Sequence, residues 1–245
     1  MPRFRNIILF SVANLSFFFQ LNWKCVFLFK QILKMNFTDI ITLSHLIKEK
    51  QLTEWKSHKK MAPTMRLHFT DEMIDNKNPR DAAVLVLLYP NANNKIQILL
   101  TKRASYNGAH SGQISFPGGK KDTSDLNLKQ TALRETKEET GIILQPENIL
   151  KKLSKTYIPP SNFWVYPFLA IQHKTPHFKP NYEVEKILEI PLKELLDDRN
   201  LICKNITTSY MKNAKVPCFK INNEIIWGAT AMILSEVKDL IKPIL

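Results

Sequence analysis

The chain has 245 residues, of which 44% are hydrophobic and 23% are charged. This composition excludes a disordered or collagen-like protein, and the length accommodates one large domain or two small ones. The three cysteines are scattered and have no Cys-x-x-Cys spacing, which disfavours a disulfide framework or a zinc knuckle and indicates a reducing compartment.

The net charge is +13, and residues 1–60 contribute +7 of it through ten Lys and Arg against three Asp and Glu. Such a surplus favours anionic partners, among them phosphates, nucleic acid and acidic lipid. The sequence contains no stripe of Arg and Lys interleaved with aromatic residues, and no RNA-binding or helix-turn-helix signature. We therefore expect no nucleic-acid partner.

Residues 1–34 form a hydrophobic extension with a basic start. The apolar run over 7–29 is long enough to span a bilayer, but polar residues interrupt it, and no small-residue cleavage site accompanies it. Two interpretations stay open. Either Met35 is the biological start and the protein is cytoplasmic, or residues 7–29 anchor it to a membrane. The first is favoured because an amphipathic helix begins just after Met35, with Asn36 or Thr38 as its N-cap.

The rest of the chain divides into an N-terminal helix and linker over residues 35–77 and one domain over 78–245. Residues 48–80 are polar and read as the linker. In the domain, apolar runs and turn residues predict a mixed sheet covered on both faces by helices, which is an α/β fold. Strands are expected at 82–89, 96–101, 113–116, 164–172, 184–190, 216–221 and 225–227, and helices at 128–140, 191–196 and 229–241.

Glycine is scarce and unevenly placed. The chain has only six glycines, and five of them lie between residues 108 and 141. Glycine serves left-handed turns, helix C-caps and close approach of the backbone to a ligand, so this window is where chemistry is expected. The five are Gly108, Gly112, Gly118, Gly119 and Gly141.

The expected helix at 128–140 carries carboxylates at i, i+3 and i+4, namely Glu135, Glu138 and Glu139. Like charges at this spacing destabilise a helix, and Arg134 can neutralise only part of them. A hard divalent ion, Mg²⁺ or Mn²⁺, would neutralise the remaining charge, because such ions bind carboxylates together with substrate phosphates. The alternative is a solvated acidic face paired with neighbouring lysines.

The spacing Arg-Glu-x-x-Glu-Glu-x-Gly over residues 134–141 is expected by chance only about 2 × 10⁻⁴ times in a chain of this length. It resembles the box of the Nudix hydrolases. The resemblance implies an α/β/α sandwich with a loop–helix–loop metal platform, which hydrolyses nucleoside diphosphates linked to another moiety. Glu135, Glu138 and Glu139 would then be catalytic metal ligands, and Arg134 would hold them by salt bridges.

A second motif, over residues 99–104 and 110–119, resembles the coenzyme A pyrophosphatase branch of that family. Further similarity lies at 157–162 and 226–230, so the resemblance covers about residues 55–245. It implies cleavage of coenzyme A or its esters to 3′,5′-ADP and (acyl-)4′-phosphopantetheine, with a homodimer as a candidate assembly. The residues expected to contact substrate are Arg103, His110, Gly112, Gln113, Gly118 and Gly119.

Two departures from the branch pattern are visible. Gly108 stands where the branch has an arginine, and the entry loop of the box is one residue longer, with Asp122 or Asp125 as its nearest acid. Glu183 resembles a distal acid that some relatives use as a base, although a surface role is as compatible with its position. Two other functions are alternatives to the hydrolysis of coenzyme A or its esters. The protein could be a Nudix hydrolase of NADH, ADP-ribose or a similar compound, or a non-catalytic nucleotide-binding module.

Overall fold

Strand β1 (Arg80–Pro90) lies inside a mixed eight-stranded sheet. In the computed structural model, which describes residues 35–105 and 112–245, residues 80–88 of β1 pair in parallel with β7 (Phe163–Ile171). Its other edge is shared by two antiparallel strands: β4 (Gly118–Lys120) pairs with residues 82–84, and β2 (Ile96–Arg103) pairs with residues 88–90. β2 therefore diverges from β1 at one end, and β4 fills part of the gap.

The remaining strands extend this sheet and form a smaller one. Strand β8 pairs with β2, and strand β3 pairs with the end of β2 beside the gap. A separate antiparallel sheet has the order β11-β10-β9. The bounds of these strands are β3 Ile114–Ser115, β5 Ile149–Lys152, β6 Thr156–Ile158, β8 Val184–Pro191, β9 Leu201–Thr208, β10 Met211–Ile221 and β11 Glu224–Trp227.

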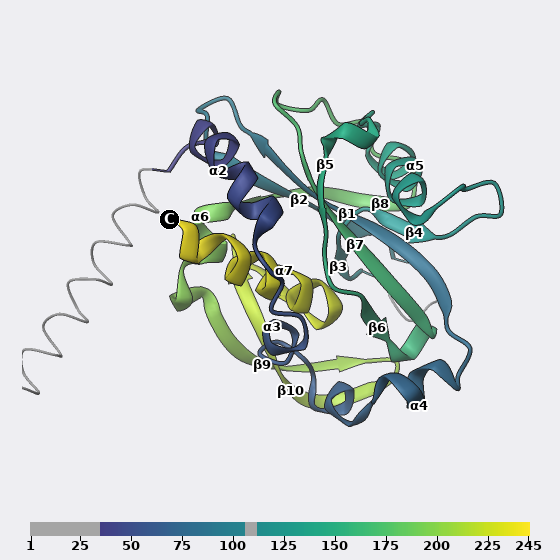
Figure 1. The fold of residues 1–245 in the computed structure, drawn as a ribbon. Helices are drawn as coiled ribbons and strands as arrows, with labels where there is room; N and C mark the ends of the chain where they lie inside the picture. Colours follow the sequence, from purple (N-terminus) through teal and green to yellow (C-terminus); the bar gives the residue numbers. More distant parts are fainter. Residues whose placement is uncertain (1–34, 106–111) are drawn as a thin grey trace, which may run out of the picture. The chain divides into compact units, whose positions relative to one another are not determined.

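Helix α5 (Leu128–Thr140) packs on one face of the sheet, where Ala132 belongs to the same core cluster as odd-numbered residues of β1. Asn127 caps its N-terminus by accepting a hydrogen bond from the Gln130 N–H, and Gly141 ends it with a φ of 76°. Since alternate residues of a strand face opposite sides, the even-numbered residues of β1 face away from α5. Helices α2 (Phe37–Glu49) and α7 (Gly228–Ile241) lie on that side (Figure 1).

Most of the expected elements are confirmed, including the α5 helix with its glycine cap, the strands at the centre of the sheet and the helix after residue 36. The α/β class is confirmed as well. The strands β4, β5, β6 and β9 were not expected, and the second sheet is larger than the hairpin expected near the C-terminus. The short helix expected to open at Pro191 is α6 (Leu192–Leu196).

The segment over residues 48–80 is not a linker. It contains helices α3 (Trp55–His58) and α4 (Asp71–Asp75), with the 3₁₀ turn η1 (Thr64–His68) between them. Ile74 is fully buried in a cluster with aromatic residues of the sheet, and the Trp164 Nε1–H donates to Asp75 Oδ1 at 3.0 Å. Tertiary contacts of a few side chains therefore order a segment whose composition is polar.

The proposed extension over residues 1–34, including the run at 7–29, lies outside the described residues. Within residues 35–105 and 112–245, none of the helices combines the length and the apolar character that a membrane crossing requires.

The Ile74→Ala variant tests the packing of α4. Ile74 is 0% exposed, so removing its side chain leaves a cavity, and we expect the free energy of unfolding to fall by about 2–4 kcal/mol. The matched control is Met73→Ala, because the neighbouring Met73 is 50% exposed and its truncation should change stability by less than about 0.5 kcal/mol. Urea unfolding measures both, and equal effects would contradict the assignment.

Candidate active site

A cavity of about 550 Å³ opens where β2 diverges from β1. Residues 82 and 84 of β1, β3 and β4 contribute to its wall, and the carboxylates of α5 stand at one end. The acidic side chains at that end come from α5 and from the residue before β8, so the fold brings together carboxylates that are distant in sequence. They are Glu135, Glu138, Glu139 and Glu183.

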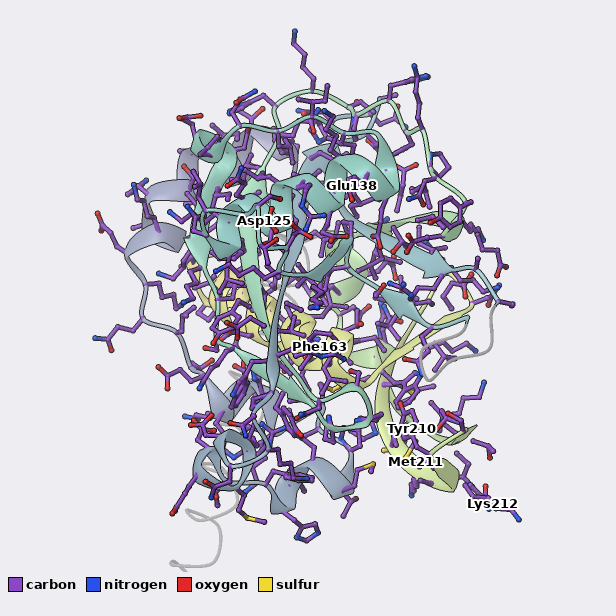
Figure 2. All side chains as sticks on the ribbon, turned by 90° about the vertical axis from the view of Figure 1, so that its right-hand side faces the viewer. Asp125, Glu138, Phe163, Tyr210, Met211 and Lys212 are labelled. Carbon is purple, nitrogen blue, oxygen red and sulfur yellow. The ribbon has the colours of Figure 1, made fainter. Side chains whose placement is uncertain are left out.

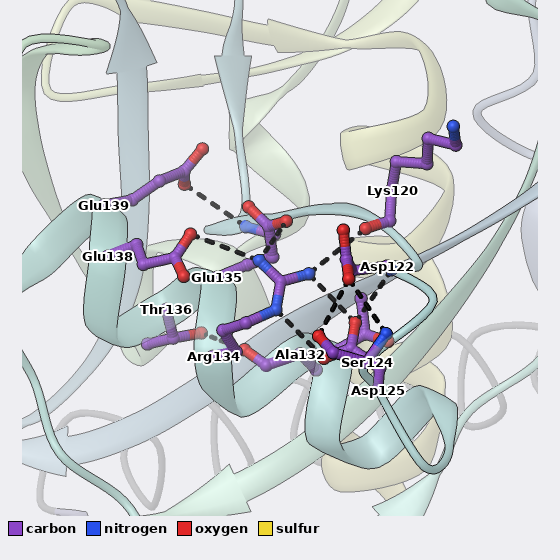
Figure 3. A network of polar contacts seen from close by, with 12 residues as sticks. Lys120, Asp122, Ser124, Asp125, Ala132, Arg134, Glu135, Thr136, Glu138 and Glu139 are labelled. Atoms are coloured by element: carbon purple, nitrogen blue, oxygen red, sulfur yellow. Dashed lines mark hydrogen bonds and ion pairs between the residues drawn. The ribbon is translucent and has the colours of Figure 1, made fainter.

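The Arg134 guanidinium is the centre of a polar network that joins the loop before α5 to carboxylates on that helix (Figure 3). Its Nε and Nη2 each donate to the Asp125 carboxylate at 2.9 Å, which is a bidentate pair. Its Nη1 donates to Glu135 Oε1 at 2.8 Å and to Glu138 Oε2 at 3.2 Å. The hydrogen bonds that Arg134 donates to Asp125 shift the pKa of both groups. They hold the pKa of Asp125 well below its usual range and raise the pKa of the Arg134 guanidinium.

Asp125 was identified in the sequence only as one of the nearest acids of the entry loop. It is 5% exposed and its carboxylate also accepts the backbone N–H of Asp122 at 2.9 Å, which closes the loop. The Asp125–Arg134 pair could not be predicted from helical spacing, because Asp125 lies in the loop before the helix that carries Arg134. The signal available was the loop composition, in which Asp122 and Asp125 stand close before an N-cap asparagine.

Glu139 lies deeper than the other carboxylates and is 4% exposed. Its Oε2 accepts the backbone N–H of Gly118 at 3.2 Å, and its Oε1 lies 3.6 Å from Arg103 Nη1. Burial raises the pKa of Glu139 to about 7, and the negative charges of Glu135 and Glu183 add to the rise, against the lowering effect of Arg103 and Gly118. Burial also raises the pKa of Glu135, where Arg134 opposes it.

Arg103 connects the helix carboxylates to the loop before β8. Its Nη2 lies 3.6 Å from Glu183 Oε2, so the guanidinium stands between Glu139 and Glu183 on the cavity wall. Its backbone N–H donates to the Gln113 carbonyl oxygen at 3.0 Å. Arg103, Gln113 and Glu183, which are distant in sequence, are therefore neighbours in the cavity.

The glycine pair of β4 makes room for this arrangement. A Cβ on Gly119 would lie 2.5 Å from the Glu135 carboxyl carbon, and one on Gly118 would collide with the backbone of β1. These glycines were expected to let the backbone approach a diphosphate. In the structure, the close neighbour of Gly119 is the Glu135 carboxylate and that of Gly118 is the β1 backbone. The absence of side chains on these glycines therefore lets the Glu135 carboxylate and β1 approach β4.

The other residues expected at the substrate separate into two groups. Gly112 lines an adjoining cavity of about 450 Å³ and adopts a φ of 65°, with open space around it. Gln113 lines both cavities. His110 and Gly108 lie outside the described residues.

The donor chemistry of the acidic end fits a hard divalent cation, since it consists of carboxylate oxygens. Within residues 35–105 and 112–245, however, no group of three or more His, Cys, Asp and Glu side chains is arranged to hold a metal ion. In the structure, Arg134 holds Glu135 and Glu138, whereas Glu139 is held by Gly118 and Arg103. A cation would have to replace arginine as the counter-charge of these carboxylates.

The opposite end of the cavity is apolar, and sequence reasoning assigned it no role. Phe163 of β7, Tyr210 of the β9–β10 turn and Trp227 of β11 line it. In Figure 2, Phe163 appears between Glu138 and Tyr210, which place the two ends of the cavity in that view. The segments at 157–162 and 226–230 were recognised as similar to a known branch, but only the fold brings them to one wall.

Comparisons with known proteins place the chain in a family. The model of the NUDIX domain matches residues 79–207. Mitochondrial coenzyme A diphosphatase NUDT8 of Homo sapiens is 34% identical over 169 residues, which are 67% of this chain and 71% of that protein. The uncharacterized Nudix hydrolase NudL of Yersinia pestis (strain Pestoides F) is 35% identical over 141 residues, 57% of this chain and 70% of that protein.

Among solved structures, a MutT/nudix family protein from Enterococcus faecalis superposes with a TM-score of 0.49 and 16% sequence identity. The match covers 79% of this chain and 76% of that one.

The Glu139→Gln variant tests the burial of a charged carboxylate. The pKa of Glu139 is about 7 in the folded protein against 4.5 for a free glutamate, so the wild type loses stability as the pH rises from about 5 to 8, whereas glutamine has no charge to bury. Without divalent metal, we expect the stability of Glu139→Gln relative to the wild type to increase by about 2–3 kcal/mol over that range. Urea unfolding at pH 5 and pH 8 measures it, and a pH-independent difference would contradict the assignment.

Proposed function

The chain belongs to the Nudix hydrolase family, and we propose that it hydrolyses the pyrophosphate bond of coenzyme A or its esters, giving 3′,5′-ADP and (acyl-)4′-phosphopantetheine. The observation that carries the proposal is the shared cavity. It is lined both by the box carboxylates Glu135, Glu138 and Glu139 and by Arg103 of the second motif, whose Nη1 lies 3.6 Å from Glu139 Oε1. The 34% identity to a human protein named as a coenzyme A diphosphatase supports the same substrate class.

Each group at the acidic end has a role in this proposal. Glu135, Glu138 and Glu139 would hold Mg²⁺ or Mn²⁺, which when bound supplies neutralisation of the phosphate charges and activation of water. Arg134 orients two of these carboxylates through its own hydrogen bonds and is itself oriented by Asp125. It is therefore a positioning residue rather than a substrate contact.

Substrate binding falls to the groups around the carboxylates. Arg103 would donate charge-assisted hydrogen bonds to phosphoryl oxygens, which are among the strong interactions available to a diphosphate. Gly118 and Gly119 keep the β4 backbone close to the reacting groups because neither has a side chain to obstruct them. Gln113 lines both the main cavity and the adjoining one, so it would contact the nucleotide portion.

The direct test is a product assay with purified full-length protein. We expect Mg²⁺- or Mn²⁺-dependent release of 3′,5′-ADP from coenzyme A or its esters, faster than cleavage of NADH or ADP-ribose, and loss of release with EDTA. Glu139→Gln should lower kcat at least about 100-fold while the protein stays folded, since a metal-binding carboxylate is removed.

The matched control for that variant is Glu147→Gln, because Glu147 is exposed and lies outside the cavity. Its activity should equal that of the wild type. Cleavage of NADH or ADP-ribose in preference to every coenzyme A compound would contradict the proposed substrate, and full activity of pure Glu139→Gln would contradict the assigned site.

A further inference from the structure

A separate cavity of about 390 Å³ lies between the segment after α3, the strands β9 and β10, and the C-terminal half of α7. Its volume is in the range of small-molecule sites in proteins. Among the described residues, none that lines it also lines the catalytic cavity. Five of its lining residues are charged, and we call it the lysine cavity. They are Lys60, Asp198, Lys238, Asp239 and Lys242.

One part of the wall of the lysine cavity is apolar. Phe219 is fully buried and Met61 is 2% exposed. Ile202 and Pro217 add further apolar surface from the neighbouring strands. Removing hydrocarbon from water against such a wall is favourable, so this part of the cavity suits a ligand with an apolar body.

The charged residues of the lysine cavity do not balance one another. Lys60 Nζ donates to both carboxylate oxygens of Asp239, at 2.8 and 2.6 Å. Lys238 and Lys242 share the Asp198 carboxylate, from which their Nζ atoms lie 2.9 and 2.6 Å. Three ammonium groups therefore line the cavity together with two carboxylates, which leaves room for one further negative charge.

Lys238 is the buried member of this set. Its side chain is 8% exposed, and its Nζ lies 2.9 Å from Asp198 Oδ1 and 5.6 Å from the centre of the Phe219 ring. Within the described residues, no group accepts a hydrogen bond from this Nζ in suitable geometry. The next carboxylate along the chain, that of Asp197, is bound by Arg199 Nε and Nη2 at 2.9 and 2.6 Å. A buried ammonium without an acceptor is costly, so an anionic acceptor would be stabilised beside it.

We propose that the lysine cavity is a second ligand site, which binds a small carboxylate with an apolar body. The carboxylate would accept hydrogen bonds from Lys238 and Lys242, and the body would pack against Phe219 and Met61. The flexible stem of a lysine lets its ammonium turn toward an anion. The charge balance and the apolar wall, which stand in one cavity, carry this inference.

The experiment titrates the isotope-labelled full chain with benzoate and follows two-dimensional amide NMR spectra at constant ionic strength. Benzamide is the uncharged control of the same shape, benzylammonium is the cationic control, and acetate lacks the apolar body. We expect benzoate to bind at least about tenfold more tightly than benzamide or acetate, since both the charged hydrogen bonds and the ring contribute. Benzylammonium should not bind, and the shifted signals should come from residues 201–203 and 235–242.

Variants change the charge balance of the lysine cavity in opposite directions. Lys238→Met and Lys242→Met each leave two ammonium groups with two carboxylates, so benzoate should bind about threefold to tenfold more weakly. Asp198→Asn removes a competing carboxylate, so benzoate should bind more tightly by a similar factor. The side chains of Lys242 and Asp198 are 25% and 66% exposed, so these two variants should keep the fold. The matched control is Lys212→Met, at an exposed lysine outside the cavity, which should change the affinity less than about twofold.

The titration needs neither metal nor nucleotide, so its result is independent of the proposed hydrolysis. Equal affinity for benzoate and benzamide, or signals that shift at Gly118 and Gly119 instead of the lysine cavity, would overturn the proposal. Equal effects of Lys242→Met and Lys212→Met, or weaker binding by Asp198→Asn than by the wild type, would overturn it as well.

Discussion

The Arg134 guanidinium joins the loop before α5 to the carboxylates on that helix. Asp125 accepts two of its hydrogen bonds, and Glu135 and Glu138 accept others, so one cation sets the position of three acidic groups. Without it, like charges at helical spacing would repel one another and destabilise α5. Glu139 is held by other partners, the Gly118 N–H and the Arg103 guanidinium.

The sheet supplies the space in which this network operates. Because β2 leaves β1 and β4 takes its place, two glycines can stand where the Glu135 and Glu139 carboxylates approach the strands. The resulting cavity is acidic at one end and apolar at the other. The two ends differ in chemistry, because the carboxylates stand at one end and Phe163, Tyr210 and Trp227 line the other.

The features of this structure that depend on local spacing could be predicted from the sequence. The carboxylates of α5 share a face because they stand three and four residues apart, and Gly141 ends the helix by a left-handed cap. Features formed by segments that are distant in sequence could not be predicted in this way. The order of residues 48–80 depends on burial of Ile74 against the sheet, and the apolar wall depends on Phe163, Tyr210 and Trp227, which only the fold brings together.

We propose that the carboxylates paired with arginine in this structure form a metal site in the working enzyme. A crystal structure of the protein soaked with Mn²⁺, examined by anomalous scattering, tests it directly. We expect an anomalous peak coordinated by at least two of Glu135, Glu138 and Glu139, with the hydrogen bonds from Arg134 to Glu135 or Glu138 broken. A crystal of protein active with Mn²⁺ that shows no peak at these carboxylates, and Arg134 still bonded to both, would contradict it.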